Sequence, residues 1–252
     1  MRISRLSVAT AMLVALSVPP APAAAAEGYS DAALFDLYFG GIWAGTIDLS
    51  MTFANDAYRA TARGRTEGLV GALYGASFDA EAQGAAPADV ASGPGARPQA
   101  FRAAGTFGGD AQSLTITYGA LGPQSVAADP PYKPKPYQIE PEDQTGVFDP
   151  LAATALLLRE RPDGALCGAE LDVFDGRRRS RVTLFEPKPG PVAGEILCDA
   201  ALSRVAGWKA KDMDKPPFAF RLFFARPGDA PARLRRFEVD TGYGMATAVR
   251  RN

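Results

Sequence analysis

Carboxylate side chains are the main groups in this sequence that have the chemistry for acid–base catalysis. The 252-residue chain contains no histidine, which excludes serine–histidine–aspartate triads, cysteine–histidine pairs and histidine metal sites. Acidic side chains gather at Asp79 and Glu81, at Glu140–Asp143 and at Asp212–Asp214. A glycosidase needs two carboxyl groups at a defined distance across a cleft, and no spacing here singles out such a pair. We therefore predict no catalytic residue, no metal site and no cofactor.

A run of arginines is the second chemically conspicuous feature. Arg177, Arg178 and Arg179 follow Asp175-Gly176, the strongest hairpin signal in the chain. A two-residue turn at this dipeptide would place Asp172 opposite Arg179, and such cross-strand ion pairs stabilise a hairpin. Guanidinium groups also suit a phosphate or carboxylate ligand. Arg177 and Arg178 are therefore candidate anion-binding residues, with cross-strand ion pairing as the alternative explanation of the cluster.

The two cysteines, Cys167 and Cys198, are predicted to form a structural disulfide. Their pairing would close a loop of about 32 residues, which is worth about 3–4 kcal/mol of stability. A redox role would require a C-x-x-C pair, and the chain has none.

The N-terminal sequence predicts export. Arg2 and Arg5 precede an apolar run over Leu6–Val18, and Ala24–Ala26 supplies a small-residue cleavage site. We expect residues 1–26 to be a signal peptide and residues 27–252 to be one periplasmic or secreted domain. The formal net charge of −1 gives no basis for nucleic-acid binding, and no run after residue 26 reaches the length of a transmembrane helix.

Alternating apolar and polar residues predict a mainly β fold. The clearest case is the apolar stripe Trp43, Ile47, Leu49, Met51 and Phe53, whose intervening positions are largely polar. Before it, either Gly40-Gly41 closes a two-residue hairpin or a wider turn extends to Gly45. Similar segments recur with glycine and proline between them, so we expect a curved antiparallel sheet or half-open barrel of about a dozen strands.

One buried helix interrupts the strands. Asp149 is a good N-cap, Pro150 suits the first helical position, and Leu151–Arg159 is apolar almost all round. The proline-rich segment before it, Gly119–Val147, is expected to be a long extended loop.

Several motifs resemble those of a family of exported bacterial proteins described as a domain of unknown function. They are Tyr38–Gly45, Thr66–Gly68, Phe148–Leu151 with Arg159, Val173–Arg178 and the closing segment Pro231–Gly244. The resemblance implies a periplasmic half-barrel with a helix, similar in plan to the outer-membrane lipoprotein carriers and to β-spiral envelope-integrity proteins. It implies no catalytic residues.

Two functions follow as hypotheses. The first is a non-enzymatic envelope protein that binds an apolar small molecule, a lipid or a segment of an envelope protein against the stripe from Trp43 to Phe53. The alternative is a periplasmic hydrolase that acts through carboxylates on a cell-wall glycan. The sequence leaves open whether side chains fill the barrel interior completely.

Overall fold

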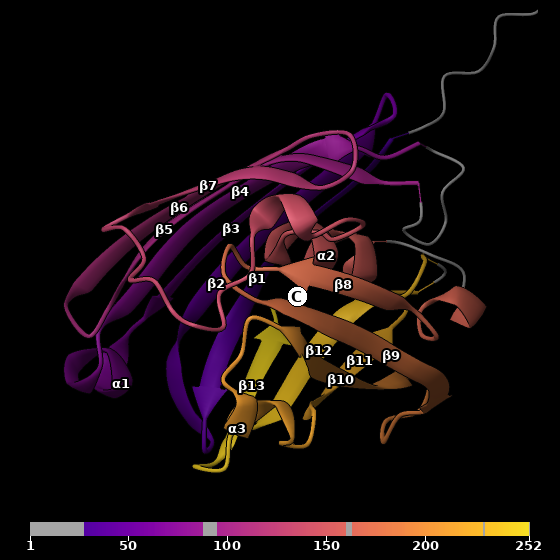
Figure 1. Ribbon diagram of the computed structural model, residues 1–252. Coiled ribbons are helices and arrows are strands. Elements are labelled where there is room, and N and C mark those ends of the chain that lie inside the picture. The colour runs from indigo at the N-terminus through magenta and orange to yellow at the C-terminus, as the bar shows by residue number, and fades with distance from the viewer. Residues whose placement is uncertain (1–27, 88–94, 160–162, 229, 252) are drawn as a thin grey trace, which may run out of the picture.

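The computed structural model describes residues 28–87, 95–159, 163–228 and 230–251 (Figure 1). Over these residues, thirteen antiparallel strands form a single curved sheet that does not close on itself. The prediction of a half-open β barrel with one buried helix is confirmed. The expected signal peptide, residues 1–26, lies outside the described residues.

The strand order places the two ends of the described chain side by side. The strands are β1 Tyr29–Phe39, β2 Ile42–Ala54, β3 Ala57–Thr66, β4 Ala76–Ala85, β5 Arg97–Phe107, β6 Asp110–Tyr118, β7 Pro123–Asp129, β8 Glu170–Phe174, β9 Arg179–Pro189, β10 Ile196–Ala206, β11 Phe218–Ala225, β12 Arg233–Asp240 and β13 Met245–Arg250. The first strand, β1, pairs with the last, β13, in the middle of the sheet. The two edges of the sheet are therefore β7 and β8.

The β1–β2 hairpin has the two-residue Gly40-Gly41 turn, the first of the two alternatives that the sequence left open. Both glycines have positive φ, at 55° and 83°, which glycine adopts without steric cost. A bulge follows at once, because Leu37 pairs with Gly45 whereas Tyr38 pairs with Trp43. Gly45 has φ of 143°, and a Cβ there would collide with the carbonyl oxygen of Arg65. The bulge turns Trp43 away from the face that Ile47 occupies.

The β8–β9 hairpin differs from the prediction by two residues. Its turn covers residues 175–178, so Asp172 lies opposite Arg181, and the expected pairing of Asp172 with Arg179 is wrong. The cause is the Asp175 side chain, whose Oδ1 accepts the backbone N–H groups of Arg177 at 2.9 Å and Arg178 at 2.8 Å. An aspartate that bonds the backbone ahead of it favours such a wider turn.

The expected loop Gly119–Val147 also requires correction, because β7 lies within it. Proline cannot donate to a strand ladder, but Pro123 stands at the start of an edge strand, where this costs little. The remaining segment, residues 130–147, has no strand and contains a short 3-10 turn over Pro141–Asp143.

The buried helix is α2, Pro150–Leu158, which lies inside the curve of the sheet (Figure 1). As predicted, Asp149 caps it by accepting the N–H groups of Leu151 at 3.0 Å and Ala152 at 2.8 Å. Two further short helices, α1 Gly68–Leu73 and α3 Ala210–Met213, have no buried residues. In the described part of the chain, no helix has the length and apolar character needed to cross a bilayer.

Candidate ligand-binding cavity

An apolar cavity of about 850 Å³ lies between the concave face of the sheet and α2. Seven phenylalanine side chains line it, together with aliphatic side chains from both halves of the sheet. Its volume is within the range of about 300–1,000 Å³ that is typical of small-molecule sites. Polar side chains are scarce in its wall: Gln112, Tyr132 and Thr154.

The cavity and the solid core occupy different parts of the barrel interior. Large side chains such as Met51, Phe53 and Ile116 are fully or almost fully buried in the core around α2. By contrast, the bulky side chains that line the cavity include six that are only half-buried: Ile47, Phe78, Leu114, Leu202, Phe220 and Phe237. Side chains therefore fill one part of the interior and leave the other part open.

The predicted apolar stripe on β2 is divided between these regions. Ile47 and Leu49 line the cavity, Leu49 as a buried residue of the core as well, while Met51 and Phe53 belong to the core alone. Trp43 lies outside the cavity, because the bulge at Gly45 reverses its direction. Its Nε1 donates to Asp36 Oδ1 at 3.1 Å.

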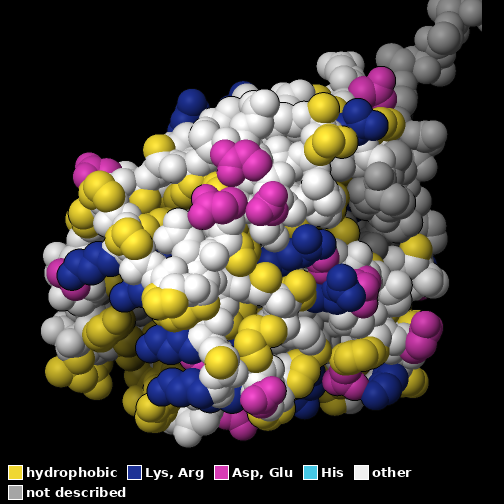
Figure 2. Space-filling view, in the orientation of Figure 1, with side chains coloured by type: hydrophobic (Ala, Val, Ile, Leu, Met, Phe, Trp, Pro, Cys, Tyr) yellow, Lys and Arg dark blue, Asp and Glu magenta, His cyan; other side chains and the backbone are white. Residues whose placement is uncertain are grey.

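The cavity opens toward the end of the sheet that carries the β5–β6 turn and α3. Phe107 and Phe218 line the cavity and are nevertheless 52% and 47% exposed. Further exposed apolar side chains come from neighbouring turns of the same end, including Leu73 and Tyr74 beside α1 and Tyr243 between β12 and β13. Figure 2 shows apolar side chains around a hollow at the lower left, the end at which α1 lies in Figure 1.

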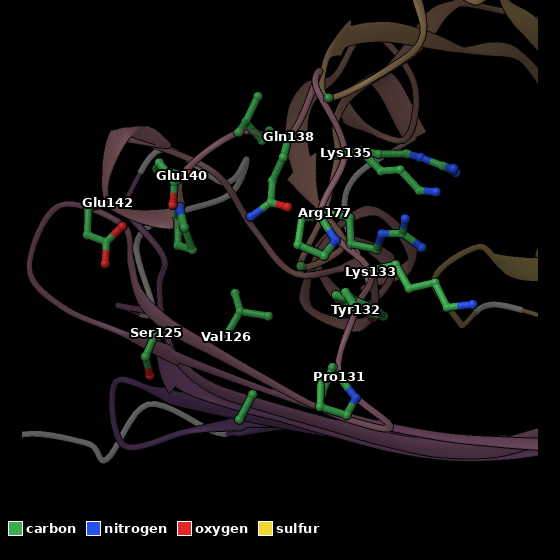
Figure 3. A pocket seen from close by; sticks show the side chains of 18 of the residues that line it. Ser125, Val126, Pro131, Tyr132, Lys133, Lys135, Gln138, Glu140, Glu142 and Arg177 are labelled. Atoms are coloured by element: carbon green, nitrogen blue, oxygen red, sulfur yellow. The ribbon is translucent and has the colours of Figure 1, made fainter.

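A second pocket, of about 580 Å³, lies in the gap between the two sheet edges, β7 and β8. Its walls come from β7, from the β8–β9 turn and from the proline-rich segment 131–142. Four cationic side chains line it: Lys133, Lys135, Arg177 and Arg178. Figure 3 shows Lys133, Lys135 and Arg177 on one side of this polar pocket, and Glu140 and Glu142 on the other.

The arginine run separates into two pairs with different surroundings. The Arg177 guanidinium lies 4.6 Å from the centre of the Tyr132 ring, and that of Arg178 lies 4.3 Å from the Trp208 ring. Arg179 and Arg181 instead donate to the Asp172 carboxylate, with Arg181 Nε 2.7 Å from Oδ1. Burial alone would raise the pKa of Asp172, but hydrogen bonds from Arg181 and Arg179 outweigh it and lower the pKa. Ion pairing with Asp172 therefore accounts for Arg179 and Arg181, while anion binding by Arg177 and Arg178 stays a prediction.

Three of the acidic side chains considered for catalysis are held in ion pairs. Asp79 pairs with Arg63 at 2.9 Å, Glu81 with Arg59, and Asp212 with Lys215 at 2.5 Å. None of these three carboxylates lines either pocket. Glu140 and Glu142 do line the polar pocket.

Asp149 is a buried carboxyl whose special environment the sequence did not reveal. Burial raises its pKa to about 7, although hydrogen bonds from the backbone of Ala152 and Leu151 act in the opposite direction. Burial is the main cause of the raised pKa of Tyr58 and of Tyr118, and the negative charge of Asp149 is the second cause. The only local signal was the N-cap position of Asp149, which does not indicate burial.

The two cysteines lie at disulfide distance. Cys167 and Cys198 are bonded, with their Cα atoms 5.5 Å apart, and both side chains are buried. The bond connects the segment before β8 to β10 across the intervening strand β9.

Comparison with known proteins identifies no family for the chain. No family model matches the chain, and no curated protein matches it. Among solved structures, the chain is similar to a crystal structure of a "Beta-barrel-like Protein of Domain of Unknown Function DUF1849 from Brucella abortus". The TM-score is 0.47 at 11% identity, covering 88% of this chain and 95% of the other. The similarity to lipoprotein carriers and envelope-integrity proteins stays a prediction.

Proposed function

We propose that this protein is a non-enzymatic, exported binding protein that holds the aliphatic chain of a lipid-like molecule in its apolar cavity. The observation that carries the proposal is the open cavity between α2 and the concave sheet face, with its half-buried aromatic and aliphatic walls. Soluble proteins rarely leave such apolar surface uncovered unless it binds something.

The composition of the wall favours an alkyl chain over a glycan. A sugar ring in this cavity would leave most of its hydroxyl groups without hydrogen-bond partners, which costs free energy for each group. Two of the three polar side chains in the wall already have partners, since Thr154 Oγ1 donates to Pro150 O at 2.8 Å and Gln112 Nε2 to Pro130 O at 2.8 Å. Each buried CH₂ group, by contrast, contributes about 0.8 kcal/mol, or about fourfold in affinity.

An uncharged fluorescent naphthylamine probe tests this proposal. We expect the probe to bind with increased fluorescence and to be displaced by primary alcohols, with affinity rising with chain length until the cavity is full. Absence of probe binding by folded protein, or displacement independent of chain length, would refute the proposal.

Two variants on one strand test where the probe binds. Ala103 on β5 lines the cavity, whereas Ala100 on the same strand does not. Ala103→Phe should fill part of the cavity and weaken probe binding. Ala100→Phe adds the same side chain outside the cavity and should leave binding unchanged. Equal binding by both variants would show that the probe binds elsewhere.

Export is supported by the sequence of residues 1–26 and by the cysteine pair, since disulfides persist in oxidising compartments. Expression of the full chain in a bacterial host should yield a mature protein that begins at Glu27. The intact mass of the purified protein measures this directly, and an unprocessed chain would contradict it.

A further inference from the structure

We infer that the ligand is an amphiphile with an anionic headgroup, whose chain lies in the apolar cavity and whose headgroup lies in the polar pocket beside Arg177 and Arg178. This inference rests on the proposed function, since the headgroup is assigned relative to a chain in the cavity. The headgroup is a carboxylate or phosphate, the two anions that guanidinium groups bind best.

The two pockets share part of their lining, so we assign the chain and the headgroup of one molecule to them. Tyr132 lines the apolar cavity and also the polar pocket. The β8–β9 turn is a second point of contact, because Gly176 lines the polar pocket and Leu114 lines the cavity. A Cβ placed on Gly176 would lie only 3.0 Å from Leu114 Cδ1. The two pockets therefore meet at Tyr132 and Leu114.

The charges in the polar pocket are arranged to favour an anion on one side. In the described part of the chain, none of the pocket's four cations forms an ion pair with a carboxylate, whereas Arg179 and Arg181 both bind Asp172. The nearest acidic side chain in the turn, Asp175, accepts the backbone N–H groups of Arg177 and Arg178. The turn thus leaves these two guanidinium groups available for a ligand.

Aromatic contacts hold the two guanidinium groups in place before any ligand binds. Arg177 lies over the Tyr132 ring and Arg178 over the Trp208 ring, and such contacts reduce the conformational freedom of a long side chain. Glu140 and Glu142 lie across the pocket from Arg177 (Figure 3). These carboxylates disfavour an anion on their own side and so confine the headgroup to the side of the arginines.

A matched pair of ligands tests the inference. Dodecanoic acid and dodecan-1-ol have the same chain, but only the acid is charged in a mildly alkaline buffer. Each is titrated against protein that holds the uncharged naphthylamine probe. We expect the acid to bind about tenfold more tightly than the alcohol, the effect of one hydrogen-bonded charge pair.

The double variant Arg177→Gln, Arg178→Gln should bind the acid no more tightly than the alcohol. Its affinity for the alcohol should equal that of the wild type. Unchanged alcohol binding also shows that the variant is folded. Arg102→Gln is the control, because Arg102 is exposed on β5 and lines neither pocket. It removes one charge and should not affect either ligand.

The outcomes separate this inference from the proposed function. If acid and alcohol bind equally well, or if the double variant weakens both to the same extent, the inference is overturned while the cavity keeps its proposed role. If neither ligand displaces the probe, the proposed function itself fails. Millimolar inorganic phosphate that binds to the pocket but leaves acid binding unchanged would assign these arginines to a free anion and overturn the inference.

Discussion

Arg250 and Asp31 are separated by 219 positions in the sequence, yet they form a two-point hydrogen-bonded pair. Arg250 Nη1 donates to Asp31 Oδ2 at 2.8 Å, and Arg250 Nη2 donates to Oδ1 at 2.6 Å. Asp31 is buried, and Arg233 on β12 lies 3.6 Å from its Oδ1. The pair joins β1 to β13, the contact at which the first and last strands meet.

Loss of this carboxylate should destabilise the protein strongly. Asp31→Asn leaves Arg250 and Arg233 without their counter-charge, and breaking a buried pair in this way costs about 3 kcal/mol. Burial alone would raise the pKa of Asp31. The hydrogen bonds from Arg250 and the charges of Arg250 and Arg233 outweigh that effect, so the pKa is lowered overall. A depressed pKa means that this stabilisation is present above about pH 4 and is lost as the carboxylate is protonated in acid.

Urea denaturation at neutral pH measures the loss. Asp36→Asn is the comparison, because Asp36 binds Arg251 in a similar two-point contact but is more exposed. Asp36→Asn should shift the urea midpoint less than Asp31→Asn does. Equal shifts for the two variants would contradict the assigned role of burial.

The disulfide should contribute about 3–4 kcal/mol, the value expected for closing a loop of this length. Replacing both Cys167 and Cys198 with alanine removes the bond without burying a new hydroxyl group. We expect the free energy of unfolding of this variant to equal that of the wild type in reductant, and to be insensitive to reductant itself. A variant as stable as the oxidised wild type would show that the bond adds nothing.

The β1–β2 bulge gives a prediction about backbone conformation. Gly45→Ala adds a Cβ that collides with Arg65 O at a position of positive φ. At Gly40 the φ of 55° lies in the left-handed helical region that an L residue can adopt, and no atom lies near a new Cβ, so Gly40→Ala should cost only about 1 kcal/mol. Thermal unfolding of the two variants should therefore show a much larger loss for Gly45→Ala. A similar loss for both would mean that the strand relaxes around residue 45.

Local signals in the sequence were sufficient for much of the fold. The N-cap at Asp149 depends on residues within one helical turn and was predicted correctly. The Gly40-Gly41 hairpin is equally local, but the sequence predicted it only as one of two possible turns. The strand β7 was missed because it begins with Pro123 and is followed by further prolines, a pattern typical of a loop. Only its position at the edge of the sheet, which pairing with β6 determines, makes Pro123 acceptable.

The candidate site depends on contacts that no local pattern contains. Arg177 and Tyr132 lie on opposite edges of the gap in the sheet, and they meet because the sheet curves. The alternation on β2 correctly placed Ile47 and Leu49 on the concave face, but it could not show where cavity ends and core begins. That boundary is set by α2, a helix about 100 residues farther along the chain.

The last prediction concerns Asp149, which is fully buried and carries a pKa raised to about 7. The pKa of an unfolded aspartate is close to 3.8. Between these values the folded protein binds one more proton than the unfolded chain, so stability falls as the pH rises. The slope is at most about 1.4 kcal/mol per pH unit. Because the chain has no histidine, few other groups titrate in this range.

Asp149→Asn isolates this contribution. The asparagine oxygen can still accept the N–H groups of Leu151 and Ala152, and asparagine is as good an N-cap as aspartate. We expect the urea concentration at the unfolding midpoint of the wild type to decrease as the pH is raised from about 5 to about 7, and then to level off. The midpoint of Asp149→Asn should stay nearly constant over the same pH range. The variant should therefore be relatively more stable at neutral pH than in mild acid. Parallel profiles for the two proteins would place the titration on another group and refute the assignment to Asp149.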